Sequence, residues 1–366
     1  MQDYGKCNLV VLFKNKFQNI KWKRMRTSVR IRLRRFYRKN KSILSVTGFA
    51  ALAFLLIFWQ FGVRSPVSRA RTFVINRGAS VGAVANQLHN HNLVVSKTAF
   101  KMAIRINGGR VQSGEYDIYP GVSVWGLARM FANGDVATTT VVIPEGLTVK
   151  QIKQQLMGMS GLTGGVECQT DKSRDVCNLK DGDLFPDTYR VARGMSRLSV
   201  LELAYKKMGA VKNSFQSYMR KLPKPLKNWH DVVTLASVVQ KETPRESEMP
   251  IVASVYINRL NKGMRLQADP TVVYAITNGL GDMQGAPLLK VHMSVDSPYN
   301  TYKKSGLPPA PIANVGRAAI GAVLRPANTK YLYFVADGKG GHKFAEDYEA
   351  HKKNHAAWRK IKKQKI

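Results

Sequence analysis

Residues 42 to 63, SILSVTGFAALAFLLIFWQFGV, contain no charged side chain, and this run constrains the fold more than any other segment. As a helix rising about 1.5 Å per residue it would extend about 33 Å, enough to cross the hydrocarbon core of a bilayer. A buried core helix rarely runs so far without a charge. A cleaved signal peptide fits less well, because the run exceeds a normal signal core and Ser68-Arg-Ala70 is a poor cleavage site. We therefore expect a transmembrane helix.

The basic residues are distributed unevenly around this segment. The formal net charge of the 366 residues is +35, and residues 1 to 41 carry seven Lys and seven Arg against the single acid Asp3. Positive charge favours the cytoplasmic side of a span. The sequence therefore predicts a basic cytoplasmic tail at 1–41 and a body, residues 64 to 366, outside the cytoplasm.

The body is itself basic, with 44 Lys and Arg against 22 Asp and Glu. Outside the cytoplasm, the anionic partners open to such a surface are membrane lipid head groups and carboxylate-bearing cell-wall polymer, so no nucleic acid is expected. A basic surface that is merely solvated is an equal alternative.

Cysteine and histidine usage fits the same topology. Cys7 falls in the basic tail, where the cytoplasm would keep it reduced, while Cys168 and Cys177 share a polar loop in an oxidising compartment. A disulfide between the latter two is one prediction, and two unrelated thiols are the alternative. The seven His residues show no ligand spacing, so we expect no metal site.

A strand-turn-helix pattern recurs three times after the predicted span, at Gly78-Ala-Ser-Val81, Gly121-Val-Ser-Val124 and Gly146-Leu-Thr-Val149. In each copy the Gly suits a turn and the Ser or Thr suits a helix N-cap. The repetition predicts small α+β modules. Their strands are expected at 72–76, 114–119 and 138–143, and their helices at 80–90, 123–134 and 148–157.

A carboxylate stands beside an apolar face in the stretch LASVVQKETPRESE, residues 235 to 248. On a helix, Val232, Leu235 and Val239 fall on one stripe, and Glu242 lies at its edge. Burial there would raise the carboxyl pKa and keep a proton available for donation. A solvated or ion-paired glutamate is the commoner outcome for an acid near a helix end.

The residues after this acid predict a junction. Thr243-Pro-Arg-Glu246 has the form of a capping box, so one helix is expected to end and another to begin at Thr243. Asp269-Pro270 has the form of a second N-cap followed by a first-turn proline. Residues 197 to 220 read as a helix, and Tyr331 to Phe344 reads as a hairpin.

Four segments between residues 231 and 355 follow one another in the order LASVVQKET, SEMPIVASVYINRLNKGMRLQADPTVVYAI, SPYNTYKKSGLPPAPIAN and KYLYFVADGKGGHKF, with His351 after them. Together they resemble the YceG-like family of endolytic murein transglycosylases, in the family's order. The modules at 72–156 and the LFPDTY segment at 184–189 extend the resemblance over most of residues 42 to 355.

The resemblance implies an α+β chain in the bacterial inner membrane. It would cross the membrane once, with a cytoplasmic N-terminus and a periplasmic catalytic domain. The implied domains are LysM-like, membrane-proximal modules at 72–156, a mixed α/β catalytic domain with a C-terminal hairpin at 157–355, and a basic tail at 356–366. The implied partners are peptidoglycan strands, inner-membrane lipid and wall synthases.

The activity implied by the resemblance is nonhydrolytic cleavage of nascent peptidoglycan strands between N-acetylmuramic acid and N-acetylglucosamine. Such cleavage leaves 1,6-anhydro ends, limits strand length and needs no cofactor. Glu242 matches the family's catalytic acid and would serve first as acid and then as base. Ordinary glycosidases need two carboxylates for these tasks.

One departure from the family pattern keeps a second function open. The family usually has Glu-Lys-Glu where this chain has Gln240-Lys-Glu242, and a glutamine can hydrogen-bond but cannot carry charge. A noncatalytic, membrane-anchored peptidoglycan-binding protein is therefore the alternative. Six residues are candidates to bind sugar groups or to orient Glu242: Gln240, Gln267, Asp269, Tyr299, Asn300 and Tyr302. Each of them could instead serve as a helix cap, a turn residue or a core residue.

Overall fold

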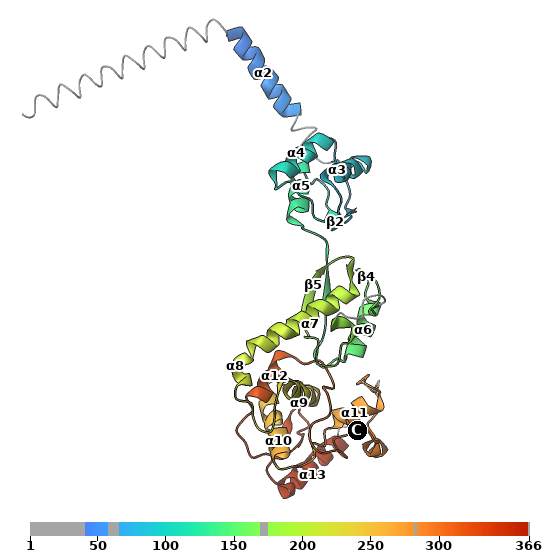
Figure 1. The fold of residues 1–366 in the computed structure, drawn as a ribbon, viewed down its shortest axis with the longest axis vertical. Helices are drawn as coiled ribbons and strands as arrows, with labels where there is room; N and C mark the ends of the chain where they lie inside the picture. Colours follow the sequence, from blue (N-terminus) through green and yellow to red (C-terminus); the bar gives the residue numbers. More distant parts are fainter. Residues whose placement is uncertain (1–40, 58–65, 169–174, 282, 284, 365–366) are drawn as a thin grey trace, which may run out of the picture. The chain divides into compact units, whose positions relative to one another are not determined.

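The computed structural model describes residues 41–57, 66–168, 175–281, 283 and 285–364 (Figure 1). Their contacts divide the chain into two compact units, of which the first ends at Asp135 and the second begins at Val136. Helix α2 spans Lys41–Ile57, and within the described ranges no helix has the length and apolarity of a membrane span. Residues 58 to 63 of the predicted span, and the basic tail up to residue 40, lie outside the described residues.

Between residues 66 and 135, the first unit pairs two antiparallel strands and adds three short helices to α2. Alternation along the strands points Phe73 and Tyr116 inward, and the ring of Phe131 packs against both, with centroid distances of 5.9 Å and 4.6 Å. All three rings are buried. The elements are β1 (Arg71–Ile75), α3 (Val81–Asn90), α4 (Lys97–Ile106), β2 (Gly114–Ile118) and α5 (Val124–Asn133).

The repeated glycine and hydroxyl positions act as the sequence predicts. The glycines have left-handed backbones, with φ of 78°, 76° and 78°, which only glycine adopts freely. Each hydroxyl then accepts a hydrogen bond from the backbone N–H three residues on, which starts the helix. The glycines are Gly78, Gly121 and Gly146, and the N-caps are Ser80, Ser123 and Thr148.

The third repeat folds within the second unit. Its strand β3 (Thr138–Val142) pairs antiparallel with β5 (Thr188–Ala192), and its helix α6 (Val149–Gly158) packs Ile152 and Leu156 into the core beneath them. The disulfide between Cys168 and Cys177 is present and confirms the predicted pairing. The sequence could not show that the third copy folds in a different unit from the first two. The three copies are alike in local sequence and differ only in the distant strand with which each one pairs.

Helices surround α9 in the rest of the second unit. Every residue of α9 from 232 to 239 is buried, so the helix is enclosed on all sides and not only along the predicted stripe. The elements of this region are α7 (Arg197–Ser214), α8 (Gln216–Met219), α9 (Trp229–Glu242), α10 (Met249–Asn261), α11 (Asp269–Ile276), η3 (Lys290–Ser294) and α12 (Arg317–Leu324).

The predicted hairpin is confirmed as β7 (Tyr333–Ala336) and β8 (His342–Ala345), which pair antiparallel. Helix α13 (Tyr348–Gln364) follows it and runs through the boundary that the sequence suggested between residues 355 and 356. The remaining elements of the second unit are the short parallel pair β4 (Leu162–Thr163) and β6 (Met195–Ser196), and the 3-10 turn η2 (Asp175–Cys177).

Two predicted helix starts are wrong. α10 begins at Met249 and not at Thr243, because the Thr243 hydroxyl accepts a hydrogen bond from the Arg245 N–H, two residues on, and thereby closes a turn instead of capping a helix. α11 is capped by Ala268, without a side-chain hydrogen bond. Asp269 is thus its first residue, and its carboxylate is not used as a cap.

Candidate active site

A pocket of about 340 Å³ opens beside the C-terminal end of α9. It brings together four of the side chains that the sequence singles out: Glu242, Gln267, Asp269 and Tyr302. Its other lining residues come from α10, the loop that follows it, the hairpin and α13. They are Tyr256, Arg259, Leu266, Phe334, Val335, His351, His355 and Trp358.

Glu242 is the last residue of α9 and is half-buried. Desolvation by the surrounding protein disfavours its charged form and raises its pKa to about 7, with a smaller contribution from the nearby negative charge of Asp269. The hydrogen bond from Tyr256 and the charge of Arg259 act in the opposite direction. The carboxyl group therefore holds a proton near neutral pH and can also give it up.

Tyr256 fixes the orientation of this acid. Its hydroxyl donates to Glu242 Oε1 at 2.6 Å. The phenol is buried, and desolvation raises its pKa well above the ordinary value, so it keeps its proton and remains a donor. Because Oε1 is occupied and Glu242 makes no second hydrogen bond within the described part of the chain, Oε2 is left to carry the mobile proton.

Arg259 brings a buried positive charge to the same pocket. Its Nε donates to the Leu332 carbonyl at 2.6 Å and its Nη1 donates to the Leu266 carbonyl at 2.8 Å. No carboxylate of the described residues lies within ion-pair distance of its guanidinium. Its charge consequently acts on Glu242 through space and stabilises the carboxylate that remains after proton donation.

Asp269, the first residue of α11, and Gln267, from the segment just before it, border the pocket. The hydroxyl of Tyr302 donates to Asp269 Oδ1, which couples α11 to the following loop. Gln267 has a left-handed backbone with φ of 52°, an uncommon conformation for a residue other than glycine, and its side-chain oxygen accepts from Arg259 Nη1 at 3.3 Å. Such local strain is frequent where a site fixes a side chain.

Three sequence candidates do not line this pocket. Gln240 accepts a hydrogen bond from the Gly316 N–H at 3.1 Å, and its side chain also hydrogen-bonds Glu145. Asn300 is buried, and its amide donates to the Met293 and Val295 carbonyls, which closes a turn. Tyr299 lies in a different cavity. Their part in binding substrate stays a prediction.

Helix α13 supplies three side chains to the pocket; His351 was named only as part of the family resemblance, and His355 and Trp358 were not predicted. His351, His355 and Trp358 line the pocket at intervals of four and three, so they share one face of the helix. His351 stacks on Tyr333 at 5.1 Å, and its Nδ1 is buried without a partner among the described residues. The spacing of these rings was a signal in the sequence, but the predicted boundary after residue 355 separated Trp358 from the other two.

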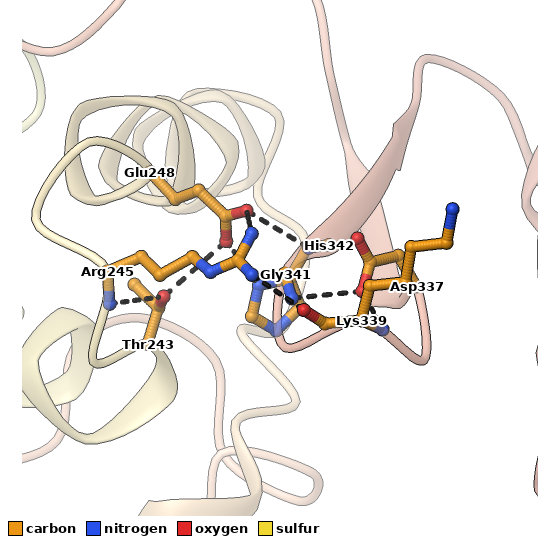
Figure 2. Close-up of polar contacts among 7 residues, drawn as sticks. All are labelled: Thr243, Arg245, Glu248, Asp337, Lys339, Gly341 and His342. Carbon is orange, nitrogen blue, oxygen red and sulfur yellow. Dashed lines mark hydrogen bonds and ion pairs between the residues drawn. The ribbon is translucent and has the colours of Figure 1, made fainter.

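A cluster of polar contacts joins the α9–α10 junction to the tip of the hairpin (Figure 2). Glu248 Oε2 lies 2.7 Å from His342 Nδ1, and Glu248 Oε1 accepts from the His342 backbone N–H at 3.2 Å. Arg245 Nη2 donates to the Lys339 carbonyl at 2.6 Å. We call Arg245, Glu248 and His342 the hairpin clasp.

The clasp supports a wall of the pocket. The ring of Phe334, on β7, meets His342 edge-on at 5.2 Å and Tyr256 edge-on at 5.8 Å. Gly341 passes so close to Glu248 that a Cβ at this position would collide with the carboxylate. The junction that carries Glu242 and the hairpin that covers Tyr256 are therefore held together by short polar contacts.

The site thus presents a protonated carboxyl group, a fixed donor, a buried cation and several aromatic rings around one cavity. This arrangement can transfer a proton to a bound substrate near neutral pH. Within the described residues, no group of His, Cys, Asp and Glu is arranged to hold a metal ion. The class of site that the geometry defines is a general-acid site.

The chain belongs to the YceG-like family, whose model matches residues 73–357. A Bacillus subtilis protein named endolytic murein transglycosylase is 30% identical over 303 residues, which are 76% of this chain and 82% of the relative. A protein of the same name from Streptococcus pneumoniae serotype 2 is 26% identical over 318 residues, so the match spans 77% of this chain and 57% of that protein. A crystal structure of a yceG-like protein from Listeria monocytogenes covers 78% of this chain and 99% of its own, at 25% identity and a TM-score of 0.48.

Proposed function

We propose that this protein is an endolytic lytic transglycosylase that cleaves peptidoglycan strands between N-acetylmuramic acid and N-acetylglucosamine. Family membership and the names of the Bacillus and Streptococcus relatives support this reaction. The single structural observation that carries it is Glu242, whose pKa of about 7 keeps a proton in a pocket of sugar-sized volume. On this proposal the enzyme releases nascent strands and limits their length.

In the first step Glu242 acts as an acid. Its Oε2 proton passes to the oxygen that bridges the two sugars, the bond from that oxygen to the muramic acid anomeric carbon breaks, and positive charge develops on the muramic acid ring. The carboxylate left behind is stabilised by the Tyr256 hydroxyl and by the charge of Arg259. Asp269, which also lines the pocket, adds negative charge that favours the cationic ring.

In the second step the same carboxylate acts as a base. It removes the proton from the 6-hydroxyl of the muramic acid ring, and that oxygen bonds to the anomeric carbon to give the 1,6-anhydro product. Glu242 is protonated again, so the cycle closes without water. The nucleophile belongs to the substrate, and its proximity replaces the second carboxylate that a hydrolase needs.

The position of Asp269 makes hydrolysis the competing outcome. Asp269 is a second carboxylate in the pocket. In an ordinary glycosidase such a second carboxylate activates water or attacks the sugar. In this protein, however, Asp269 Oδ1 accepts the Tyr302 hydroxyl. We propose that this contact makes Asp269 a substrate-positioning and electrostatic group.

We also propose that the protein is anchored in the inner membrane by residues 42 to 63, with a cytoplasmic N-terminus and LysM-like modules beside the membrane. The charge-free run, the fourteen basic residues before it and the disulfide of Cys168 and Cys177 support a periplasmic body. Lipid head groups and wall synthases are the proposed partners. Protease added outside spheroplasts should digest the body, and protection of the body would contradict this topology.

The function is tested by digesting purified sacculi and uncrosslinked glycan with the full-length protein in detergent, followed by mass analysis of the products. The proposal predicts anhydro-muramyl ends from the wild type and none from Glu242→Gln. Reducing ends would identify a hydrolase. If neither protein released fragments while both sedimented with sacculi, the noncatalytic wall-binding alternative would be correct.

A further inference from the structure

A second cavity, of about 440 Å³, shares the helix α11 with the catalytic pocket but none of its lining residues. Two aromatic rings form part of its wall: Tyr274, from α11, and Tyr299, whose ring centroids are 4.8 Å apart. The Tyr274 hydroxyl donates to Asp181 Oδ2 at 2.6 Å, and Asp181 Oδ1 accepts from the Val149 N–H at 2.6 Å. Tyr274 is therefore held in place by contacts to two other segments.

Lysine side chains surround this aromatic pair. Lys150, Lys153 and Lys180 all line the cavity, opposed by Glu167 and Asp181. Lys153 is paired with Glu167 at 2.9 Å. The other two are exposed, and neither ammonium group lies within ion-pair distance of a carboxylate in the described part of the chain. The cavity thus combines two tilted aromatic rings with two exposed lysines, of which Lys180 also acts through its charge on the nearby Asp183 carboxylate.

Two short segments connect this cavity to the catalytic pocket. On α11, Asp269 lines the pocket and Tyr274 lines the cavity, and five residues of helix rise about 7.5 Å. In the following loop Tyr302 lines the pocket and Tyr299 lines the cavity. The two hollows therefore share two lining segments, α11 and the loop of residues 299 to 302.

We propose that the cavity of Tyr274 and Tyr299 is a second glycan subsite, which binds a carboxylate-bearing sugar of the same strand that Glu242 cleaves. Aromatic rings offer apolar surface to a pyranose ring, and Lys150 and Lys180 offer charge to its acidic substituent. The strand would extend from the pocket at Asp269 and Tyr302 to the cavity at Tyr274 and Tyr299. This subsite rests on the proposed function. It gives a physical reason for cleavage inside long strands, because an internal sugar of a strand can occupy it and no chain end is required.

The test uses the full-length protein and compares Lys150→Glu/Lys180→Glu with Lys206→Glu/Lys212→Glu. The second pair has the same charge change on exposed lysines of α7 that line neither hollow. Cleavage kinetics are measured on long strands and on the shortest fragment that the wild type cleaves. Binding of the same double variants to sacculi is measured in the Glu242→Gln background, which separates binding from chemistry.

The subsite predicts that Lys150→Glu/Lys180→Glu raises KM for long strands about tenfold, or about 1.4 kcal/mol, with kcat and the kinetics on the shortest fragment unchanged. Tyr299→Ala should have the same effect. Equal KM values for the two lysine pairs on long strands, or equal binding to sacculi, would overturn the subsite. Absence of any cleavage by the wild type would overturn the proposed function instead, and the binding comparison would still decide whether strands occupy the cavity.

Discussion

The pKa of Glu242 determines how this site should respond to pH. Donation requires the protonated form, which desolvation preserves up to a pKa of about 7. We therefore expect kcat/KM to fall above this pH by about tenfold per pH unit. A pH-rate profile on soluble glycan measures the fall, and a flat profile between pH 6 and 9 would exclude Glu242 as the acid.

Removing the Tyr256 hydroxyl should move that profile. Its hydrogen bond stabilises the carboxylate and lowers the pKa of Glu242, so Tyr256→Phe should shift the basic limb to higher pH and reduce the rate at neutral pH. Tyr218→Phe, on α8 and away from the pocket, is the matched control. An unmoved limb would show that Tyr256 only fills space.

Glu242 should also lower the stability of the folded protein at neutral pH. Its pKa is raised on folding from 4.5 to about 7, so the folded state holds the proton more tightly and loses stability as pH rises through this window. Glu242→Gln should therefore raise the free energy of unfolding at pH 8 by about 1 to 3 kcal/mol and leave it unchanged at pH 4. Urea titration at the two pH values measures the free energy of unfolding, with Glu346→Gln as the exposed control. Equal stability of the wild type and Glu242→Gln at pH 8 would contradict the raised pKa.

At the scale of elements, the hairpin clasp should govern the mobility of β7 and β8. Glu248→Ala removes the acceptor for both the His342 ring and its backbone N–H (Figure 2). We expect faster hydrogen exchange across residues 333 to 345, a loss of about 1 to 3 kcal/mol in stability and a lower kcat, because Phe334 no longer braces Tyr256. Glu346→Ala, beside the same hairpin, should change none of these.

The elements also show what the sequence can and cannot predict. The glycine turns, their N-caps and the hairpin follow from local chemistry, and the structure confirms them. The junction after Glu242 does not follow, because a threonine followed by a proline suits a turn as well as a helix start. The pocket wall from α13 depends on packing between distant segments, and residue spacing alone indicates only that its rings share a face.

Gln240 illustrates the same limit at the site. Sequence places it two residues before Glu242, and on a helix this spacing turns the two side chains to different faces. The structure accordingly directs Gln240 to Glu145 and Gly316, and Glu242 to Tyr256. Because Gln240 does not line the pocket, its lack of charge is no obstacle to the single-carboxylate reaction proposed for Glu242.

At the scale of the whole molecule, the disulfide should stabilise the second unit. It closes a segment with a sequence separation of 9, beside the core beneath β3 and β5. Chain entropy predicts that Cys168→Ser/Cys177→Ser lowers the free energy of unfolding by about 2 to 3 kcal/mol. Thermal melts with and without reductant measure this: the wild type should lose stability on reduction and the double variant should not, and a wild type indifferent to reductant would contradict a structural disulfide.

The central claim is that Glu242 cleaves the strand without water, and isotope incorporation tests it most directly. Strands are digested in water enriched in heavy oxygen, and the new ends are examined by mass spectrometry. The account predicts anhydro ends that carry no heavy oxygen from the wild type, and no new ends from Glu242→Gln. New reducing ends labelled with heavy oxygen from the wild type, and lost in Asp269→Asn, would contradict it, because water would then be the nucleophile and Asp269 its partner.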